Sequence, residues 1–143
     1  MAEYTYNSIQ IVEDGQNVLL QDSIPCNRGY VIHRNGSGIL TLRGIVNNPC
    51  SKFARYKVEF NGNIAIPTGG TAGEISLALA IDGEPIQTSR ARVTPTVTNA
   101  YFNVTSVANI TVPAGCCLTI SVENTSGVPI NVQNSNLTVD RTA

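Results

Sequence analysis

Apolar and polar residues alternate along most of this chain, and that alternation limits the folds it can adopt. A period of two places successive side chains on opposite faces of an extended strand. No segment repeats apolar residues with the period of an amphipathic helix. Turn-forming pairs such as Asp14-Gly15, Asn61-Gly62 and Asp82-Gly83 interrupt the alternation at short intervals, as is usual between strands. The sequence therefore predicts an all-β domain.

The alternating segments predict about nine or ten strands in a two-layer sandwich. The expected strands are residues 7–12, 17–21, 30–34, 39–45, 53–66, 74–81, 86–93, 100–111, 117–123 and 129–140. No internal repeat or linker divides the chain, so residues 1–143 are expected to form a single domain. Within it, residues 1–16 are interpreted either as an N-terminal docking arm or as an ordinary first strand.

Charge is scarce and argues against two classes of partner. Charged residues make up only 13% of the 143 residues, and the net charge is −1. No basic run interleaves with aromatic residues, so we expect no nucleic-acid partner. No apolar stretch approaches the roughly 20 residues of a membrane-spanning helix, so we expect no membrane partner. The N-terminus, MAEYTYNSIQ, lacks the basic and apolar regions of a secretory signal, which predicts synthesis in the cytoplasm.

Two expected strands carry no charge on the face that points away from the core. In the segment 100–111, the core face is expected to hold Phe102, Val104, Ala108 and Ile110. The opposite, uncharged face holds Tyr101, Asn103, Thr105, Val107 and Asn109. In the segment 74–81, the face opposite the apolar residues holds Ser76, Ala78 and Ala80. Fully solvated faces usually carry charge, so a subunit interface is favoured over a monomer with solvated Asn- and Thr-rich faces.

Candidate chemistry is sparse. His33 is the single histidine, and no Gly-x-Ser-x-Gly or comparable nucleophile motif accompanies it. The acidic residues are scattered along the chain. The glycine-rich stretches 36–38 and 67–73 are not followed by the helix N-terminus or the Lys-Ser/Thr pair of a phosphate site. We therefore expect no catalytic residues, no cofactor and no enzymatic activity.

The four cysteines lack the Cys-x-x-Cys spacing of zinc and redox sites, so no metal is expected. Cys116 and Cys117 are adjacent, and adjacent strand residues point to opposite faces. Cys116 is expected to face the core, while Cys117 is expected to face a subunit neighbour or a loop. Cys26 and Cys50 each follow a proline in an expected loop. Both a disulfide between them and two free thiols remain open.

Several stretches resemble the jelly-roll domains of the tumour-necrosis-factor (TNF) and C1q-like superfamily. VPAGCCLTISVEN resembles their penultimate strand, NLTVDR resembles their last strand, and ISLALAIDGEPI occupies the middle of the chain. The resemblance implies an antiparallel jelly-roll sandwich of about 8 to 10 strands. It also implies a homotrimer in which strands of one sheet pack around the threefold axis. The candidate interface residues are then Tyr101, Asn103, Thr105, Val107 and Cys117.

A second resemblance is to small jelly-roll proteins encoded in phages and prophages of Gram-positive anaerobes. It rests on VIHRNGSGILTLRG, FNGNIAIPTGGTAGEISLALAIDGEPI and YFNVTSVANITVPAGCCLTISVENTS, and covers most of the chain from about residue 26. It implies a virion structural protein of the head-decoration or head-fibre type, located on the virion surface, with a phage capsid protein as partner. That group offers no active-site residues. The chain has no Gly-X-Y collagen stalk.

The alternative function is a carbohydrate- or receptor-binding jelly-roll module on a phage or bacterial surface. Its partner would be a glycan, and Tyr30, Tyr56 and Tyr101 would supply aromatic rings that stack on sugars. The two functions predict different places for these rings. A binding module requires an exposed aromatic cluster, whereas a structural role favours burial of the rings.

Overall fold

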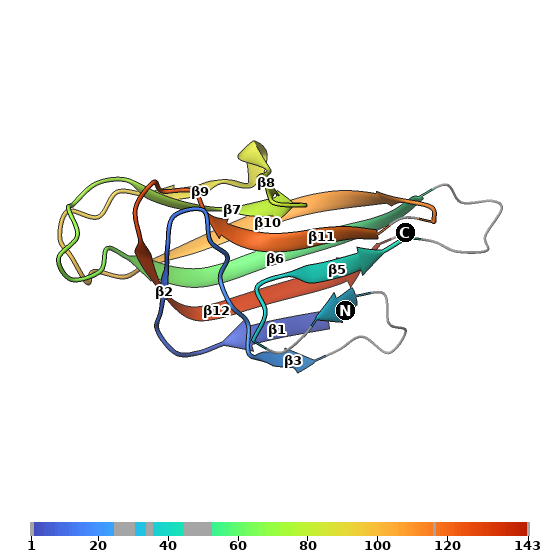
Figure 1. Cartoon of the computed structure of the whole chain (residues 1–143), viewed down its shortest axis with the longest axis horizontal. Coiled ribbons are helices and arrows are strands. Elements are labelled where there is room, and N and C mark those ends of the chain that lie inside the picture. The colour runs from blue at the N-terminus through green and yellow to red at the C-terminus, as the bar shows by residue number, and fades with distance from the viewer. Residues whose placement is uncertain (1, 25–30, 34–35, 45–52, 116, 143) are drawn as a thin grey trace.

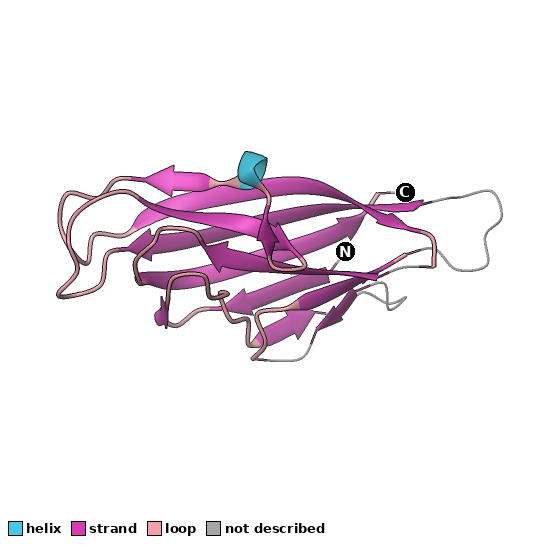
Figure 2. Cartoon of the chain, turned by 45° about the horizontal axis from the view of Figure 1, so that its top comes forward, coloured by secondary structure: helices cyan, strands magenta, loops and turns pink. Residues whose placement is uncertain are grey.

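Two antiparallel β-sheets pack face to face in a computed structural model of the chain, which describes residues 2–24, 31–33, 36–44, 53–115 and 117–142 (Figure 1, Figure 2). Sheet A has the order β10 (Phe102–Pro113), β6 (Phe53–Ala65), β12 (Ile130–Arg141), β1 (Ala2–Tyr6) and β3 (Asp22–Ile24), and β2 (Gln10–Val12) also pairs with β12. Sheet B has the order β4 (Val31–His33), β5 (Leu40–Arg43), β11 (Cys117–Asn124), β7 (Ile75–Ile81) and β8 (Glu84–Pro85), and β9 (Ala91–Val93) also pairs with β7. The expected all-β jelly-roll sandwich is confirmed.

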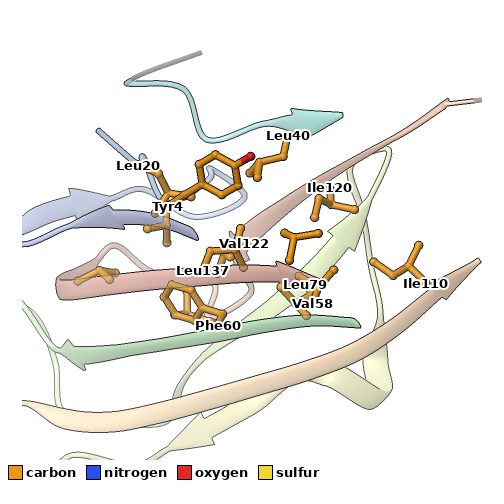
Figure 3. Packing of buried hydrophobic residues seen from close by; sticks show 14 of the residues in the cluster. Tyr4, Leu20, Leu40, Val58, Phe60, Leu79, Ile110, Ile120, Val122 and Leu137 are labelled. Carbon is orange, nitrogen blue, oxygen red and sulfur yellow. The ribbon is translucent and has the colours of Figure 1, made fainter. Parts of the chain in front are cut away.

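Large apolar side chains from both sheets fill the space between them. Figure 3 shows this core, to which β1, β6, β7, β11 and β12 contribute. Its members include Tyr4, Phe60, Leu79, Val122 and Leu137, each at most 1% exposed. Burial contributes roughly 1.5–3 kcal/mol for a side chain of this kind. The alternation therefore identified the core face of most long strands.

Strand β7 is buried on both faces within one chain. Its outward residues Ser76, Ala78 and Ala80 are at most 1% exposed. The Ser76 hydroxyl lies 2.6 Å from the Thr125 hydroxyl and accepts a hydrogen bond from Arg90 Nε at 3.1 Å. The expected burial of this small-residue face is therefore found, and the surface that covers it belongs to the chain itself rather than to another subunit.

The expected strand 86–93 is found only in part. Residues 91–93 form β9, which pairs with β7, whereas Gln87–Ser89 forms a short 3₁₀ turn between β8 and β9. The Ser89 hydroxyl donates a hydrogen bond to the carbonyl of Ile86 at 2.7 Å and accepts one from the amide of Leu79 at 3.0 Å. A serine hydroxyl that bonds nearby backbone groups competes with a strand ladder, and alternation does not reveal this competition.

The start of the chain differs from the expected strand 7–12. Residues 2–6 form β1, which pairs with both β12 and β3 and buries Ala2 and Tyr4, and a second short strand, β2, follows. Residues 2–6 thus form an ordinary first strand. A docking arm would need them to be free of the sheet. The segment 17–21 has a single bridge, between Asn17 and Glu123, in place of a ladder.

Phe102 does not lie in the core as expected, because 42% of it is exposed. It is the first residue of β10, and β10 is an edge strand with a hydrogen-bonded neighbour on one side only. Val104 and Ile110 of the same strand are buried as expected. The first residue of this edge strand is thus exposed, whereas residues further along the strand are buried in the core.

An irregularity in β12 reverses which residues face the core. The register with β6 shifts between Gln133 and Asn136, and Asn134 has a positive φ of 56°. Ile130 and Val132 are buried before the shift, and Leu137 and Val139 after it, so the buried positions change from even to odd numbers. An inserted residue of this kind is a β-bulge. It explains why neither parity of β12 is uniformly apolar.

Gly62 of β6 lies beside this bulge. A Cβ atom at Gly62 would lie 2.9 Å from the ring atom Cζ of Phe60 and 3.7 Å from the carbonyl oxygen of Gln133. The Phe60 ring is fully buried, so it has little room to move. The glycine therefore makes room for the ring where the two strands change register.

We predict that Gly62→Ala lowers the free energy of unfolding by about 1–3 kcal/mol, the usual cost of overpacking a core. Gly73→Ala is the matched control, because a Cβ there meets nothing within 4 Å, and its effect should stay within about 0.5 kcal/mol. Equilibrium urea unfolding followed by circular dichroism measures both values. Equal effects of the two substitutions would contradict the packing role of Gly62.

Candidate interaction surface

The outward side chains of sheet A form rows that cross its strands. One row, fixed by the register of β1, β12, β6 and β10, holds Thr5, Asn136, Asn61 and Thr105. The row beside it holds Gln133, Asn63 and Asn103. We call Asn61, Asn63, Asn103, Thr105 and Asn136 the amide face. All five are at least partly exposed, and none is charged.

Hydrogen bonds between strands hold the amide face in place. Asn103 Nδ2 donates to Asn63 Oδ1 at 3.1 Å, and Thr105 Oγ1 donates to Asn61 Oδ1 at 3.3 Å. Each bond uses part of a side chain's capacity, because an amide offers two donors and an acceptor with two lone pairs. The amide face therefore presents pre-oriented donors and acceptors on a flat surface.

The two ends of this surface differ in character. Toward one end, Ile9 is 53% exposed and Ile11 is 65% exposed, and Ile11 lies opposite Asn131 in the register of β2 and β12. Toward the other end, Lys57 and Glu59 form an exposed ion pair at 3.0 Å. Because the ends differ, a second copy meeting this surface would distinguish one orientation from the other.

The edge of sheet A beside the amide face is also uncharged. Strand β10 has 12 residues and none of them is charged. Natural proteins usually protect edge strands with charges, bulges or a covering segment. The covering here is local: the Ser106 hydroxyl donates to the carbonyl of Ser89 in the 3₁₀ turn. An uncharged edge thus adjoins the neutral amide face. Charges border that face: Lys57 and Glu59 lie toward one end, and Asn136 Nδ2 donates to the Glu3 carboxylate at 3.1 Å.

The structure brings together four of the five candidate interface residues. Asn103, Thr105 and Val107 are exposed on the outer face of β10, while Tyr101 is half-buried and its hydroxyl accepts a hydrogen bond from Asn131 Nδ2 at 3.4 Å. Cys117 is exposed, but it belongs to β11 of sheet B, where it pairs with Arg43. Cys117 therefore lies on a different sheet from Asn103, Thr105 and Val107, and the interface itself stays a prediction.

Other candidate residues have structural surroundings or lie outside the described residues. Tyr56 is 1% exposed and its hydroxyl donates to the carbonyl of Arg43, so its ring cannot stack on a sugar. His33 Nε2 lies 2.9 Å from the carbonyl oxygen of Ser37, and the His33 ring lies 4.7 Å from that of Tyr4. The expectations for Cys26, Tyr30, Cys50 and Cys116 fall outside the described residues.

Sequence reasoning missed Ile9, Ile11, Asn61, Asn63 and Asn136 as part of this surface. Asn61 and Asn63 belong to β6, and Asn136 lies just after the bulge of β12. The sequence of β6 and of β12 did contain a sign of this surface, namely neighbouring outward residues without charge. Their arrangement in rows depends on the register between strands, which a single sequence does not display.

On the outer face of sheet B, Glu123 has an unfavourable electrostatic environment. Partial burial raises the pKa of the Glu123 carboxyl, and the charges of Asp14 and Glu84 raise it further. Asp14 accepts a hydrogen bond from the amide of Gly127 at 2.9 Å, which holds its loop near this strand. Over the part of the chain that the structure describes, no group of three His, Cys, Asp or Glu side chains is placed to hold a metal ion.

Comparisons with solved structures show the class of fold. The chain is similar to the globular domain of a zebrafish complement 1qA protein, with a TM-score of 0.58, 13% identity, and coverage of 94% of this chain and 93% of that one. It is also similar to the Eiger TNF from S. frugiperda, with a TM-score of 0.65, 13% identity, and coverage of 100% and 92%. The fold is therefore a jelly roll of the C1q and TNF type.

No protein-family model matches the sequence, and no curated protein matches it significantly. In the described residues, no helix has the length and apolar character to cross a membrane. At 13% identity, the structural likenesses establish the fold alone.

We predict that Glu123→Gln reduces the loss of stability that the wild type shows as the pH rises. A folded-state pKa above the ordinary value of 4.5 means that the folded protein binds more protons than the unfolded chain at pH values between the unfolded-state and folded-state pKa. This contribution is fully present below pH 4.5 and is lost as the pH rises through the folded-state pKa. Urea unfolding midpoints measured across this range give the test.

Asp82→Asn is the control of opposite sign. The Thr119 backbone amide and side-chain hydroxyl donate to Asp82 Oδ1 and lower the pKa of that carboxyl below 3.8. This contribution is present above pH 3.8 and is lost as the pH falls through the folded-state pKa. The same midpoint curve for Glu123→Gln and the wild type would contradict the account of Glu123.

Proposed function

We propose that this chain is a non-enzymatic structural protein that assembles as a homotrimer and acts by multivalent contact on a virion surface. The observation that carries the proposal is the amide face together with the uncharged edge strand β10 beside it. Solvated sheet faces and free edges usually carry charges. The neutral amide face and the neutral edge strand, although bordered by Glu3, Lys57 and Glu59, fit a surface that another protein subunit covers.

The way the amide face adjoins the β10 edge supports a ring-shaped assembly. The amide face and the β10 edge are different surfaces that meet along one strand. If the edge of one subunit packs on the face of the next, the contact is heterologous, and such contacts generate closed rings when the rotation closes. The resemblance to the TNF and C1q-like superfamily favours a ring of three.

The interface in this proposal is polar at its centre. Asn61, Asn63 and Asn103 keep free donors and acceptors after their bonds within the chain. Hydrogen bonds between subunits are satisfied only in one register, because each unpaired buried amide costs about 1–3 kcal/mol. Val107, which is 44% exposed, supplies apolar area beside them. The amides would set the register and the apolar groups would add burial energy.

The virion location is supported by the resemblance of the sequence to small jelly-roll proteins of phages. A trimer presents three identical surfaces to a threefold position of a capsid lattice, so weak individual contacts add up to firm attachment. The carbohydrate-binding alternative relied on an exposed tyrosine cluster. Burial of Tyr56 removes one member of that cluster.

The oligomer is tested by size-exclusion chromatography with light scattering at about 100 µM, a concentration at which a weak trimer is still populated. The wild type should show three times the mass of one chain. Val107→Glu should shift the protein toward the monomer, because it places three charges in the buried contact. Ile32→Glu, at an exposed position of β4 in sheet B, is the matched control and should remain trimeric. A monomeric wild type would contradict the proposal.

The virion role needs a separate measurement. Trimeric protein should co-sediment with capsids of a related phage from which the decoration protein is missing, and Val107→Glu should co-sediment much less because it loses multivalency. A trimer that does not bind any such capsid would leave the assembly intact and contradict the virion role.

A further inference from the structure

A cavity opens at the end of the sandwich that lies opposite the chain termini. Its volume is about 370 Å³ and it lies between the loop that follows β6 and the turn that precedes β12. Pro67, Thr68 and Thr71 contribute from the first loop, and Val128 and Pro129 from the second. This volume lies at the lower end of the range of about 300–1,000 Å³ found for small-molecule sites.

The cavity loops are held firmly by the rest of the fold. Asn99 donates through its backbone to the Ile66 carbonyl at 2.8 Å and through its side chain to Thr68 Oγ1 at 2.8 Å. On the other side, buried Asn124 donates through Nδ2 to the carbonyl of Val128 at 2.8 Å. A site whose walls are already fixed loses little conformational entropy when it binds a ligand.

The walls have a chemical character that narrows the ligand. Three loops at this end, residues 67–73, 94–101 and 125–129, contain no charged residue, while Asp14 of the loop after β2 accepts a hydrogen bond from the amide of Gly127. Threonine hydroxyls both donate and accept hydrogen bonds, and the glycines of the first loop leave backbone groups uncovered. A Cβ at Gly70 would lie 2.6 Å from Ile66 Cγ2, so a larger residue there would disturb this wall. Proline and valine supply apolar area between the polar groups.

We propose that this cavity binds an uncharged saccharide. A pyranose ring has apolar C–H faces that suit Pro67, Val128 and Pro129, and hydroxyls that suit Thr68, Thr71 and exposed backbone groups. None of the lining residues is charged, so a carboxylate or a phosphate would find no ion-pair partner among them, and its desolvation would be poorly compensated. An extended apolar peptide would leave the hydroxyls of the walls unpaired.

The position of the cavity suits recognition of a distant surface. Thr142, near the C-terminus, donates to the carbonyl of Arg55 near the start of β6, whereas the cavity follows the end of β6. The 13 residues of β6 therefore separate the two ends by about 40 Å. Figure 1 shows both termini on one side and these loops on the other. The site is distinct from the amide face, so the inference stands whether or not the trimer forms.

The test uses the full chain labelled with ¹⁵N and the methyl glycosides of glucose, galactose, mannose and N-acetylglucosamine as probes. Without an aromatic ring in its lining, the cavity should bind its best probe with a dissociation constant on the order of 1 mM. The amide signals of Thr68, Gly69, Gly70, Thr71 and Val128 should shift. Methyl glucuronide should cause at least about tenfold weaker shifts, because its carboxylate finds no partner.

Val128→Arg should abolish the shifts, and Thr71→Glu gives a second, independent change of the cavity wall. Val97→Arg is the matched control, because Val97 is exposed on a neighbouring loop and does not line the cavity. Well-dispersed spectra show that each variant is folded. The proposal is overturned if no methyl glycoside shifts these signals up to about 50 mM, if Val128→Arg binds like the wild type, or if a neutral proline-containing peptide binds in place of the sugars.

Discussion

The pairing of β6 with its two neighbours is the constraint on which the rest of the structure depends. Strand β6 has 13 residues and pairs with β10 on one side and β12 on the other. Its even-numbered residues from Ala54 to Ile64 build one wall of the core. Its odd-numbered residues from Arg55 to Asn63 carry the outer surface. The bulge of β12 beside Gly62 keeps the core face and the outer face separate along β12, because it returns apolar residues to the core after the register shift. Without the bulge, the last residues of β12 would turn their apolar side chains to the outer face.

This register also creates the surface on which the proposed function rests. Asn61 and Asn63 lie beside Thr105 and Asn103 because β6 and β10 pair without an irregularity. The same pairing leaves β10 at the edge of sheet A. Face and edge are thus joined by the geometry of one strand pair, and the proposed heterologous contact between subunits needs both. The saccharide cavity depends on the end of β6, where the chain leaves the sheet.

Alternation was enough to predict the all-β class, the long strands and most of the core. Leu77, Leu79 and Ile110 are buried as a period of two requires. It failed where side-chain hydrogen bonds replace a ladder, as for Ser89, and at a strand end, as for Phe102. Alternation also failed to show the bulge at Asn134. The bulge depends on a positive φ at a single asparagine, and the pattern of apolar and polar residues does not reveal such a dihedral angle. The neutral face of β10 was visible in the sequence, whereas its neighbours in β6 and β12 follow from the register. Cys117 lies on sheet B, apart from Asn103, Thr105 and Val107, and the sequence did not show this separation because sheet membership of β11 is a long-range property.

Amide hydrogen exchange of β10 as a function of protein concentration tests the central claim most directly. An edge strand exposes alternate backbone amides to water in the monomer, and burial of that edge by a second subunit would slow their exchange. The account predicts that those amides between Phe102 and Pro113 exchange slowly at high concentration and faster on dilution, while the amides of β12 are unaffected. Fast exchange of the outward amides of β10 at every concentration would contradict the claim that another subunit covers this edge.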